Sequence, residues 1–387
     1  MKILFIEWES YGKKDLKEAF KAEGHSLCSF PFTLYADERV VNNPETEKEL
    51  ASVLHREVPD IVFSVDYYPV ISKVCNTEHI RYISWIYDSP YRDLYSQTIV
   101  NPCNRVYVFD RRIYQEFSSA GVSTVQYLPL AANTERLDGM LNTPDSGDFL
   151  YDISFVGSLY MEYEQFYDQM TGRLPDYAKG YLDALIAAQM QIQGYNFVEE
   201  VLPPVTDMLC RALPIISLPG GIESKEYLYA QYIINRRVTA VERIDLLDAI
   251  AERHVVDVFT HSPEFSMLNI CNHGPVDYHT EMPKVFQSSK INLNISVRSI
   301  QSGIPLRAFD IMGAGGFLLS NFQPDFMEHF VPGQDMVCYE NKRDLVRKVE
   351  YYLAHEEERQ AIARNGHDKV AAEHTYRHRV REMLNFE

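Results

Sequence analysis

The sequence predicts an α/β protein of two doubly wound domains, each a parallel sheet covered by helices. Short apolar runs typical of buried parallel strands alternate with amphipathic helical segments, and this alternation indicates a doubly wound sheet. A polar run at residues 136–150 separates two such series and is interpreted as a linker. The length of 387 residues gives each domain enough chain for its own core.

The first domain begins directly with a strand at residues 2–8, which form a continuous apolar run. A helix follows, and its apolar face and stop are Leu16, Ala19, Phe20 and Gly24. Asn43 as N-cap and Pro44 in the first turn predict a second helix. Further strands are predicted at residues 61–65, 82–87, 105–110 and 125–130. No GxGxxG follows the first strand, so the usual dinucleotide fingerprint is absent.

Carboxylates and tyrosines follow the predicted strands of the first domain. In doubly wound sheets ligands bind beyond the carboxyl ends of the strands. Glu7, Asp66, Tyr68 and Asp88 come at such ends and predict an acceptor-binding surface with a proton-transfer group. The alternative for Asp88 is a structural one, because an Asp before Ser-Pro is a common turn residue.

The second domain is predicted to begin with a strand at residues 151–156. Gly157 and Ser158 follow, and they either let backbone approach a ligand or form a tight turn. Residues 160–254 are interpreted as a helical insertion with an apolar core stripe of Leu182, Leu185, Ile186, Met190 and Ile192. Later strands are predicted at residues 255–260, 291–296, 317–320 and 336–340, with helices at 281–288 and after the N-cap Asn341.

The stretch from Ser299 to Asn321 carries the chemistry on which the functional prediction depends. Gly303 and Pro305 predict a turn into a helix, whose free N–H groups and dipole favour a phosphate. Arg307 adds a forked cation for a diphosphate, and Asp310 an acceptor for a sugar diol. Together they suggest a nucleotide-diphosphate-sugar site. The alternative is that this stretch is an ordinary turn and helix of an α/β domain, in which Arg307 and Asp310 form a surface pair.

Composition excludes several partners. The formal net charge of −18 argues against a nucleic-acid backbone or an anionic membrane. The chain has no signal-peptide pattern and no apolar run of the roughly 20 residues a spanning helix needs, so we expect a cytoplasmic protein. Six scattered cysteines without a CxxC pair predict buried free thiols and no zinc site; they are Cys28, Cys75, Cys103, Cys210, Cys271 and Cys338.

Long strings in the chain resemble the CgeB-like spore-maturation glycosyltransferases and the domain often fused ahead of them. The strings are VFSVDYYPVIS (62–72), YISWIYDSPY (82–91), YLPLAAN (127–133), MPKVFQSSKINLNIS (282–296), GIPLRAFDIMGAGGFLLSN (303–321), FVPGQDMVCYE (330–340) and EHTYRHRV (373–380). The match covers both ends of the chain, and few matching residues lie in the middle. It implies the GT-B fold, in which two Rossmann-like domains face a cleft, and a relationship to retaining family 4 glycosyltransferases.

The resemblance also implies boundaries and roles. It implies an acceptor-side domain at 1–135, a linker at 136–150, a nucleotide-sugar domain at 151–370 with the insertion at about 160–254, and a helix at 371–387 that crosses back. Asp88 and Arg307 are implied as catalytic. The implied donor-binding residues are Gly157, Ser158, Val276, Tyr278, Ser302, Gly303, Ile304, Arg307 and Asp310, with Val276 and Tyr278 beside the base.

The chain departs from its relatives at one catalytic position. Retaining relatives carry two glutamates eight positions apart; the second aligns with Asp310, and the first with Ser302. The chain also lacks Asp-x-Asp, so we expect a metal-independent reaction without a cofactor. The expected activity moves a sugar, from UDP by preference, to a protein or surface-glycan acceptor. Two alternatives stay open: a sugar-nucleotide hydrolase or epimerase, and an inactive nucleotide-binding scaffold. The sequence does not identify the sugar, the acceptor or the oligomeric state.

Overall fold

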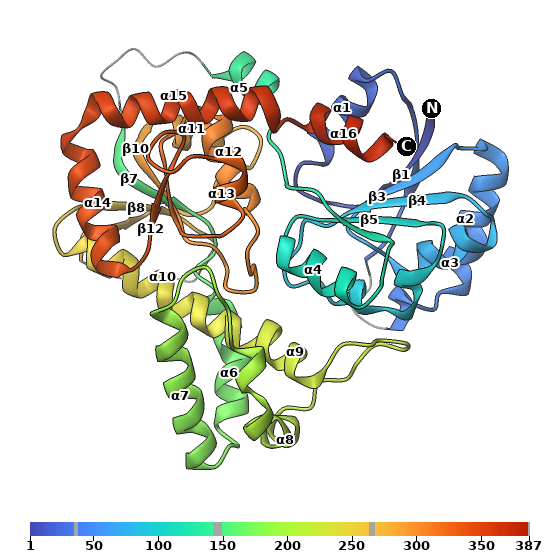
Figure 1. Cartoon of the computed structure of the whole chain (residues 1–387), viewed down its shortest axis with the longest axis horizontal. Helices are drawn as coiled ribbons and strands as arrows, with labels where there is room; N and C mark the ends of the chain where they lie inside the picture. The colour runs from blue at the N-terminus through green and yellow to red at the C-terminus, as the bar shows by residue number, and fades with distance from the viewer. Residues whose placement is uncertain (35–37, 142–148, 263–267, 386–387) are drawn as a thin grey trace. The chain divides into compact units, whose positions relative to one another are not determined.

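The computed structural model describes residues 1–34, 38–141, 149–262 and 268–385 (Figure 1). The chain divides into two compact units, and each is described by itself. The first unit comprises Met1–Leu130, Ile216–Ser224 and Tyr376–Glu387, and the second comprises Ala131–Ile215 and Lys225–Thr375. The short segment 216–224 lies inside the predicted helical insertion in sequence, yet it belongs to the first unit. Residues 142–148 of the predicted linker lie outside the described part.

The first unit contains a six-stranded parallel sheet in the order β2-β1-β3-β4-β5-β6. Its strands are β1 (Lys2–Glu7), β2 (Ser26–Pro31), β3 (Ile61–Val65), β4 (Arg81–Trp85), β5 (Asn104–Val108) and β6 (Val125–Tyr127). Five of the six were predicted within a few residues. The sequence did not predict β2, because this edge strand is largely solvent-accessible and lacks the continuous apolar run of its neighbours.

The helices of the first unit include those that the sequence predicted around Leu16 and after Asn43. They are α1 (Lys13–Ala22), α2 (Pro44–Glu57), α3 (Pro69–Thr77), α4 (Arg111–Ser119) and α16 (Tyr376–Leu384), with 3₁₀ turns η1 (Glu38–Val40), η2 (Arg92–Tyr95) and η3 (Gln97–Val100). The predicted cap of α2 is confirmed, since the Asn43 side chain accepts a hydrogen bond from the Thr46 amide at 3.2 Å. Leu16, Ala19 and Phe20 of α1 are buried as expected.

The second unit contains another six-stranded parallel sheet, in the order β12-β11-β10-β7-β8-β9. Its strands are β7 (Tyr151–Val156), β8 (Val256–Phe259), β9 (Ile270–Asn272), β10 (Ser289–Asn294), β11 (Leu318–Asn321) and β12 (Val337–Tyr339). All but β9 were predicted. Strand β9 has only three residues and two of them are exposed, so it carries no apolar signal.

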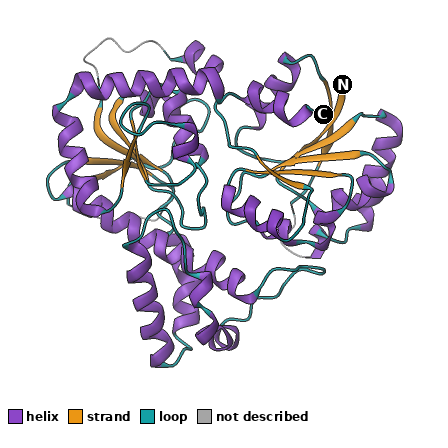
Figure 2. Cartoon of the chain, viewed as in Figure 1, coloured by secondary structure: helices purple, strands orange, loops and turns teal. Residues whose placement is uncertain are grey.

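The helices of the second unit cover its sheet and form the predicted insertion (Figure 2). They are α5 (Thr134–Met140), η4 (Met161–Tyr163), α6 (Glu164–Thr171), α7 (Asp176–Met190), η5 (Glu199–Val201), α8 (Pro203–Ala212), α9 (Lys225–Tyr229), the π-helical η6 (Ala230–Ile234), α10 (Asn235–Ala251), α11 (Met282–Gln287), α12 (Leu306–Gly313), α13 (Phe326–His329), α14 (Lys342–Ala354) and α15 (Glu356–Glu373). The insertion has its own apolar core, which includes Leu182, Leu185 and Ile186. Ile192 was wrongly assigned to that core, because it lies beyond the end of α7 and is exposed.

Both sheets reverse their strand order at one point. In the first unit the chain proceeds outward on opposite sides of the border between β1 and β3, and in the second it does so at the border between β7 and β10. Ligands of doubly wound sheets bind outside the carboxyl ends of the strands at such a switch point. The predicted α/β class is confirmed, and each unit has a defined edge where a site is expected.

The structure bears on two other predictions, which concern the cysteines and membrane-spanning helices. All six cysteines are free thiols, but only Cys75 and Cys338 are buried and Cys271 is exposed, so the prediction that these thiols are buried holds for part of the set. No helix in the described residues has the length and hydropathy needed to cross a bilayer.

The C-terminal helix α16 completes the first unit by packing beside α1 (Figure 1). Glu23, which follows α1, accepts hydrogen bonds from Arg377 at 2.8 Å and from Arg381 at 2.7 Å. The Arg381 hydrogen bond is the main reason that the pKa of Glu23 is lowered. Tyr376 is buried, and its ring packs edge-on against Trp85. The two ends of the chain therefore stabilise each other.

We predict that Gly12→Ala destabilises the protein more than Gly24→Ala. Both glycines have left-handed backbone, at φ 71° and 81°, so both variants lose about 1–2 kcal/mol to conformation. A Cβ at Gly12 would also lie 2.4 Å from the Tyr376 hydroxyl oxygen, whereas a Cβ at Gly24 would meet nothing within 4 Å. Urea unfolding should show an additional loss of about 1–3 kcal/mol for Gly12→Ala. Equal midpoints for the two variants would contradict the assigned packing of α16.

Candidate functional site

The start of α12 is the central feature of the candidate site in the second unit. The helix begins at Leu306, one residue after the predicted start, and its N-cap is Pro305, which provides no side-chain cap. The first N–H groups of a helix have no partner within the helix, so these groups and the positive end of the dipole lie at the start of α12, in the segment that follows β10. The helix ends at Gly313, and Gly315 follows with left-handed backbone at φ 75°.

Three predicted donor-binding side chains meet on α12 and the loop before α11. The Tyr278 hydroxyl donates to Asp310 Oδ1 at 3.0 Å, and Arg307 Nη1 lies 4.0 Å from Asp310 Oδ2. Arg307 also contacts the Met282 sulfur and lies 5.5 Å from the centre of the Phe286 ring. The guanidinium is thus oriented by neighbours and still half-exposed, which suits a group that binds an anion.

The residues between β10 and α12 are less accessible than the sequence suggested. Ser302, Gly303 and Ile304 are all buried, and the Ser302 carbonyl accepts a hydrogen bond from the Asp325 amide at 3.1 Å. The Ser302 side chain, 7% exposed, therefore has limited access to a ligand. Any contact from Gly303 or Ile304 must come from the backbone.

The loop after β7 is a hydrogen-bonded turn. The Ser158 hydroxyl donates to the Glu162 carboxylate and accepts from the Tyr160 amide at 2.8 Å. Tyr160 has left-handed backbone at φ 61°, and the Leu159 amide is held by Ser262 at 2.7 Å. Of the two interpretations offered for Gly157 and Ser158, the structure contains the tight turn, so a ligand would meet backbone here and not the Ser158 hydroxyl.

The loop that carries Val276 is shaped by Asp277. The Asp277 carboxylate accepts hydrogen bonds from the His279 and Thr280 amides at 3.1 and 2.8 Å. This turn leads into α11 and directs Tyr278 toward Asp310. Val276 is half-buried one residue before the turn.

Sequence reasoning missed Arg243 of α10, which reaches the same edge of the sheet. Its Nη1 donates to the Ser158 carbonyl, and its Nε donates to the Ile295 carbonyl at 3.1 Å. The residue is 8% exposed. No local signal marks it, because an arginine inside a long helical run is normally interpreted as part of a solvated face.

In the first unit, Asp66 lies at the carboxyl end of β3 with left-handed backbone at φ 59°. Its Oδ1 accepts hydrogen bonds from the Tyr87 amide at 2.8 Å and the Asp88 amide at 3.3 Å. Its Oδ2 is buried and has no partner among the described residues. Burial raises the pKa of Asp66 well above its usual range, and the charge of Asp88 adds to this effect. Asp66 therefore supports the Asp88 loop from inside.

The predicted acceptor-side residues differ in their access to solvent. Glu7 is held by Lys17 and by Ser29 at 2.8 Å, and although burial opposes it, these contacts lower its pKa. Tyr68 is 2% exposed, because its ring packs 4.7 Å from the ring centre of Phe32. Asp88 alone of the four is exposed, and crowding by protein atoms raises its pKa. Contrary to the prediction, Tyr68 is a core residue and Glu7 is committed to an ion-pair network.

The segment 216–224 adds an acidic group that the sequence did not indicate. It is joined to the loop at η2 and η3 by bonds from the Gln97 amide to the Gly220 carbonyl, 2.9 Å, and from the Ile222 amide to the Tyr95 carbonyl, 2.8 Å. Burial raises the pKa of Asp93 to about 6, and the nearby Glu223 also raises it. Asp93 and Glu223 thus extend the acidic character of this edge.

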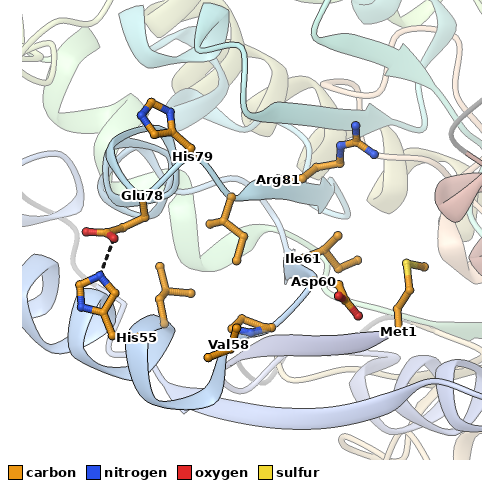
Figure 3. Close-up of a pocket in the computed structure, with 11 residues that line it drawn as sticks. Met1, His55, Val58, Asp60, Ile61, Glu78, His79 and Arg81 are labelled. Carbon is orange, nitrogen blue, oxygen red and sulfur yellow. Dashed lines mark hydrogen bonds and ion pairs between the residues drawn. The ribbon is translucent and has the colours of Figure 1, made fainter.

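A pocket of about 530 Å³ lies at the opposite, amino-terminal edge of the first sheet (Figure 3). Met1, Ile61 and Arg81 line it at the starts of β1, β3 and β4. His55 and Glu78 meet at its rim, with 2.7 Å between Nε2 and Oε2. No predicted site residue lines this pocket. Among the described residues, no three His, Cys, Asp or Glu side chains are arranged to hold a metal ion.

Known proteins of similar fold are glycosyltransferases and a synthase. Residues 237–385, less than half of the chain, match a family model described as glycosyl transferase-like. A glycosyltransferase from Rickettsia africae is 11% identical with a TM-score of 0.53, covering 100% of this chain and 99% of its own. Anabaena HepE in complex with UDP and glucose is 10% identical with a TM-score of 0.53, covering 100% of both chains. Sucrose-phosphate synthase from Thermosynechococcus elongatus is 12% identical with a TM-score of 0.52, covering 99% and 98%.

These findings bear on two predictions from the sequence. The similar structures confirm the predicted GT-B fold of two α/β domains. The family model confirms the predicted enzyme class, a glycosyltransferase. No curated protein sequence matches the chain. The finer resemblance, to CgeB-like proteins and to retaining family 4, stays a prediction.

We predict that Asp66→Asn stabilises the protein increasingly as the pH rises above about 4. The folded-state pKa of Asp66 is raised, so the folded protein holds a proton that the unfolded chain has released, and stability falls as pH rises toward that pKa. Asparagine cannot ionise but can still accept from the Tyr87 and Asp88 amides. Thermal unfolding from pH 4 to 8 should show that the Tm of Asp66→Asn increasingly exceeds that of the unsubstituted protein, by about 2–4 °C for each kcal/mol of added stability.

Asp66→Ala is the matched control for this prediction. It removes the charge and the hydrogen-bond acceptor together, so the Tyr87 and Asp88 amides lose their partner and stability should fall at every pH. A difference between Asp66→Asn and the unsubstituted protein that stays constant from pH 4 to 8 would refute the raised pKa.

Proposed function

We propose that the chain is a retaining, metal-independent glycosyltransferase that moves a sugar from a UDP-sugar to a protein or surface-glycan acceptor. The observation that carries the proposal is the meeting of Arg307, Asp310 and Tyr278 near the start of α12, where the Arg307 side chain is 27% exposed. This cluster follows β10 at the switch point of the second sheet, the usual ligand position in this kind of fold.

Charge development in the reaction explains why these groups are suitable. When the bond between the sugar and the diphosphate breaks, negative charge accumulates on the leaving diphosphate. The Arg307 guanidinium presents paired donors to phosphate oxygens, and the α12 N–H groups add the positive end of a helix dipole. We infer that these groups stabilise the leaving group in place of a metal ion.

The polar pair beside Arg307 is proposed to bind the nucleoside. Asp310 offers carboxylate oxygens to a sugar diol, and the Tyr278 hydroxyl fixes the orientation of that carboxylate. Val276 lies in the same loop and would contact the base through its backbone. UDP is preferred as the nucleotide because HepE of similar fold was crystallised with UDP and with UDP-glucose.

On the acceptor side we assign proton transfer to Asp88. It is exposed, and its loop is held by the buried Asp66 through the Asp88 amide. The raised pKa of Asp88 brings it nearer to neutrality, which favours proton acceptance from a hydroxyl. The location is proposed to be the cytoplasm, because all six cysteines are free thiols, as expected in a reducing compartment.

We predict that Arg307→Ala weakens UDP binding and slows sugar transfer, each by about 10- to 100-fold, the range for losing a hydrogen bond to a charged group. Thermal-shift titrations with UDP, GDP, dTDP, CMP and their sugars identify the donor, because a ligand at 100 times its Kd adds about 2.7 kcal/mol of stability. Transfer is then measured with a radiolabelled donor and candidate acceptors.

The matched control is Arg253→Ala, which removes an exposed arginine paired with Glu350 elsewhere in the second unit. It should leave UDP binding and transfer unchanged. Full transfer activity in Arg307→Ala would overturn the diphosphate assignment. Donor consumption without acceptor would indicate a hydrolase or epimerase, and nucleotide binding without any turnover would indicate a scaffold.

A further inference from the structure

Arg243 bridges the two strands that flank the switch point of the second sheet. Its Nη1 donates to the carbonyl of Ser158, just after β7, and its Nε and Nη2 donate to the carbonyl of Ile295, just after β10. These three bonds use three of the five N–H groups of a guanidinium. The side chain therefore lies where ligands of doubly wound sheets bind, and it retains two further donors.

Among the described residues no carboxylate forms an ion pair with Arg243, although the charge of Glu242 acts on it from a distance. The adjacent Glu242 is committed to Arg298, whose Nε donates to it at 2.6 Å, and both of these side chains are buried. The Arg243 guanidinium instead lies 5.3 Å from the ring centre of Phe155 and 5.1 Å from that of Tyr160. A buried charge without a counter-ion is costly, so an anion at this position would be stabilised.

Arg307 brings a second positive charge toward the same place. Burial lowers the pKa of Arg243; the neighbouring Tyr160, Glu242 and Tyr339 raise it, and the charge of Arg307 lowers it. Two arginines that repel each other at the carboxyl edge of one sheet form an arrangement that a dianionic group would relieve. Gly157 places no side chain beside the guanidinium, since a Cβ there would lie 3.4 Å from the Phe155 ring and 3.9 Å from Arg243 Nη1.

Position, and not burial alone, distinguishes Arg243. Arg359 of α15 is also buried and forms no ion pair with the residues that the structure describes, and it donates to the Tyr352 carbonyl at 2.7 Å. Its guanidinium lies 5.4 Å from the ring centre of Phe149, beside the amino-terminal start of β7, and within electrostatic range of Asp152. Arg359 is therefore at the opposite end of the strand and serves as a comparison.

We propose that Arg243 is the second cation of a diphosphate site at the β7–β10 switch point and that it positions the phosphates together with Arg307. The inference rests on the proposed donor site and adds a residue to it. The guanidinium fixes the Ser158 and Ile295 carbonyls and presents its remaining donors and its charge to the anion. Arg243 is thus a positioning residue for the leaving group.

Equilibrium titrations with inorganic pyrophosphate, UDP and uridine test the proposal on the full-length chain. Arg243→Met, which keeps length and removes charge, should weaken pyrophosphate and UDP binding about tenfold or more, as expected for losing a charge-assisted contact. Uridine affinity should stay unchanged, because uridine carries no phosphate. Arg243→Lys should recover most of the pyrophosphate affinity, and Arg359→Met should leave all three ligands unaffected.

The outcomes separate this proposal from the proposed function. Unchanged pyrophosphate affinity in Arg243→Met overturns the proposal, and so does an equal loss for uridine and UDP, which would mean a purely structural role. If Arg243→Met does not fold, Arg243→Lys decides: pyrophosphate affinity near that of the unsubstituted protein supports the proposal, and its loss overturns it. Pyrophosphate binding without any preference for a uridine nucleotide would support the anion site and overturn UDP-sugar use, whereas absence of both would overturn both.

Discussion

The parallel arrangement of each sheet is the constraint that decides where chemistry can occur. Parallel strands present their carboxyl ends at one edge, and that edge opens where the strand order reverses. In the second unit β7 and β10 pair Ile153 with Ile291 and Phe155 with Leu293. This register places the two strand ends beside each other, so that one side chain, Arg243, can hold the carbonyls of both following segments. The start of α12 depends on the same edge.

Buried charge is handled differently in the two units. In the second unit Glu242 and Arg298 form a buried ion pair, Arg307 lies 4.0 Å from Asp310, and Arg243 has no ion-pair partner among the described residues. In the first unit the buried Asp66 is held by backbone amides, and no cation pairs with it among the described residues. One edge is therefore suited to an anionic leaving group and the other to proton transfer, and each is stabilised by the sheet beneath it.

The sequence predicted the features that depend on local physical signals. Apolar runs marked ten of the twelve strands, and Asn43 marked a helix start that the structure confirms. It could not predict β2 and β9, whose exposed residues lack an apolar pattern. The sequence also could not predict which polar side chains take part in contacts within the fold and are therefore not accessible to a ligand. Glu7 forms an ion pair with Lys17, and Tyr68 is buried. The position of Arg243 at the sheet edge results from tertiary packing, and the sequence of its helix contains no signal that would predict it.

The position of Asp88 bears on the stereochemistry of transfer. A reaction that inverts the anomeric carbon needs a base for the acceptor hydroxyl, whereas a retaining reaction can proceed without one. Asp88 is exposed, its loop is fixed by Asp66, and crowding by protein atoms raises its pKa. Ser302, by contrast, is buried at the position where the retaining glycosyltransferases that the sequence resembles carry a glutamate. Retention is what the sequence resemblance implies, so a product with the anomeric configuration of the donor supports the proposed reaction, and an inverted product would overturn retention and leave Asp88 as the base.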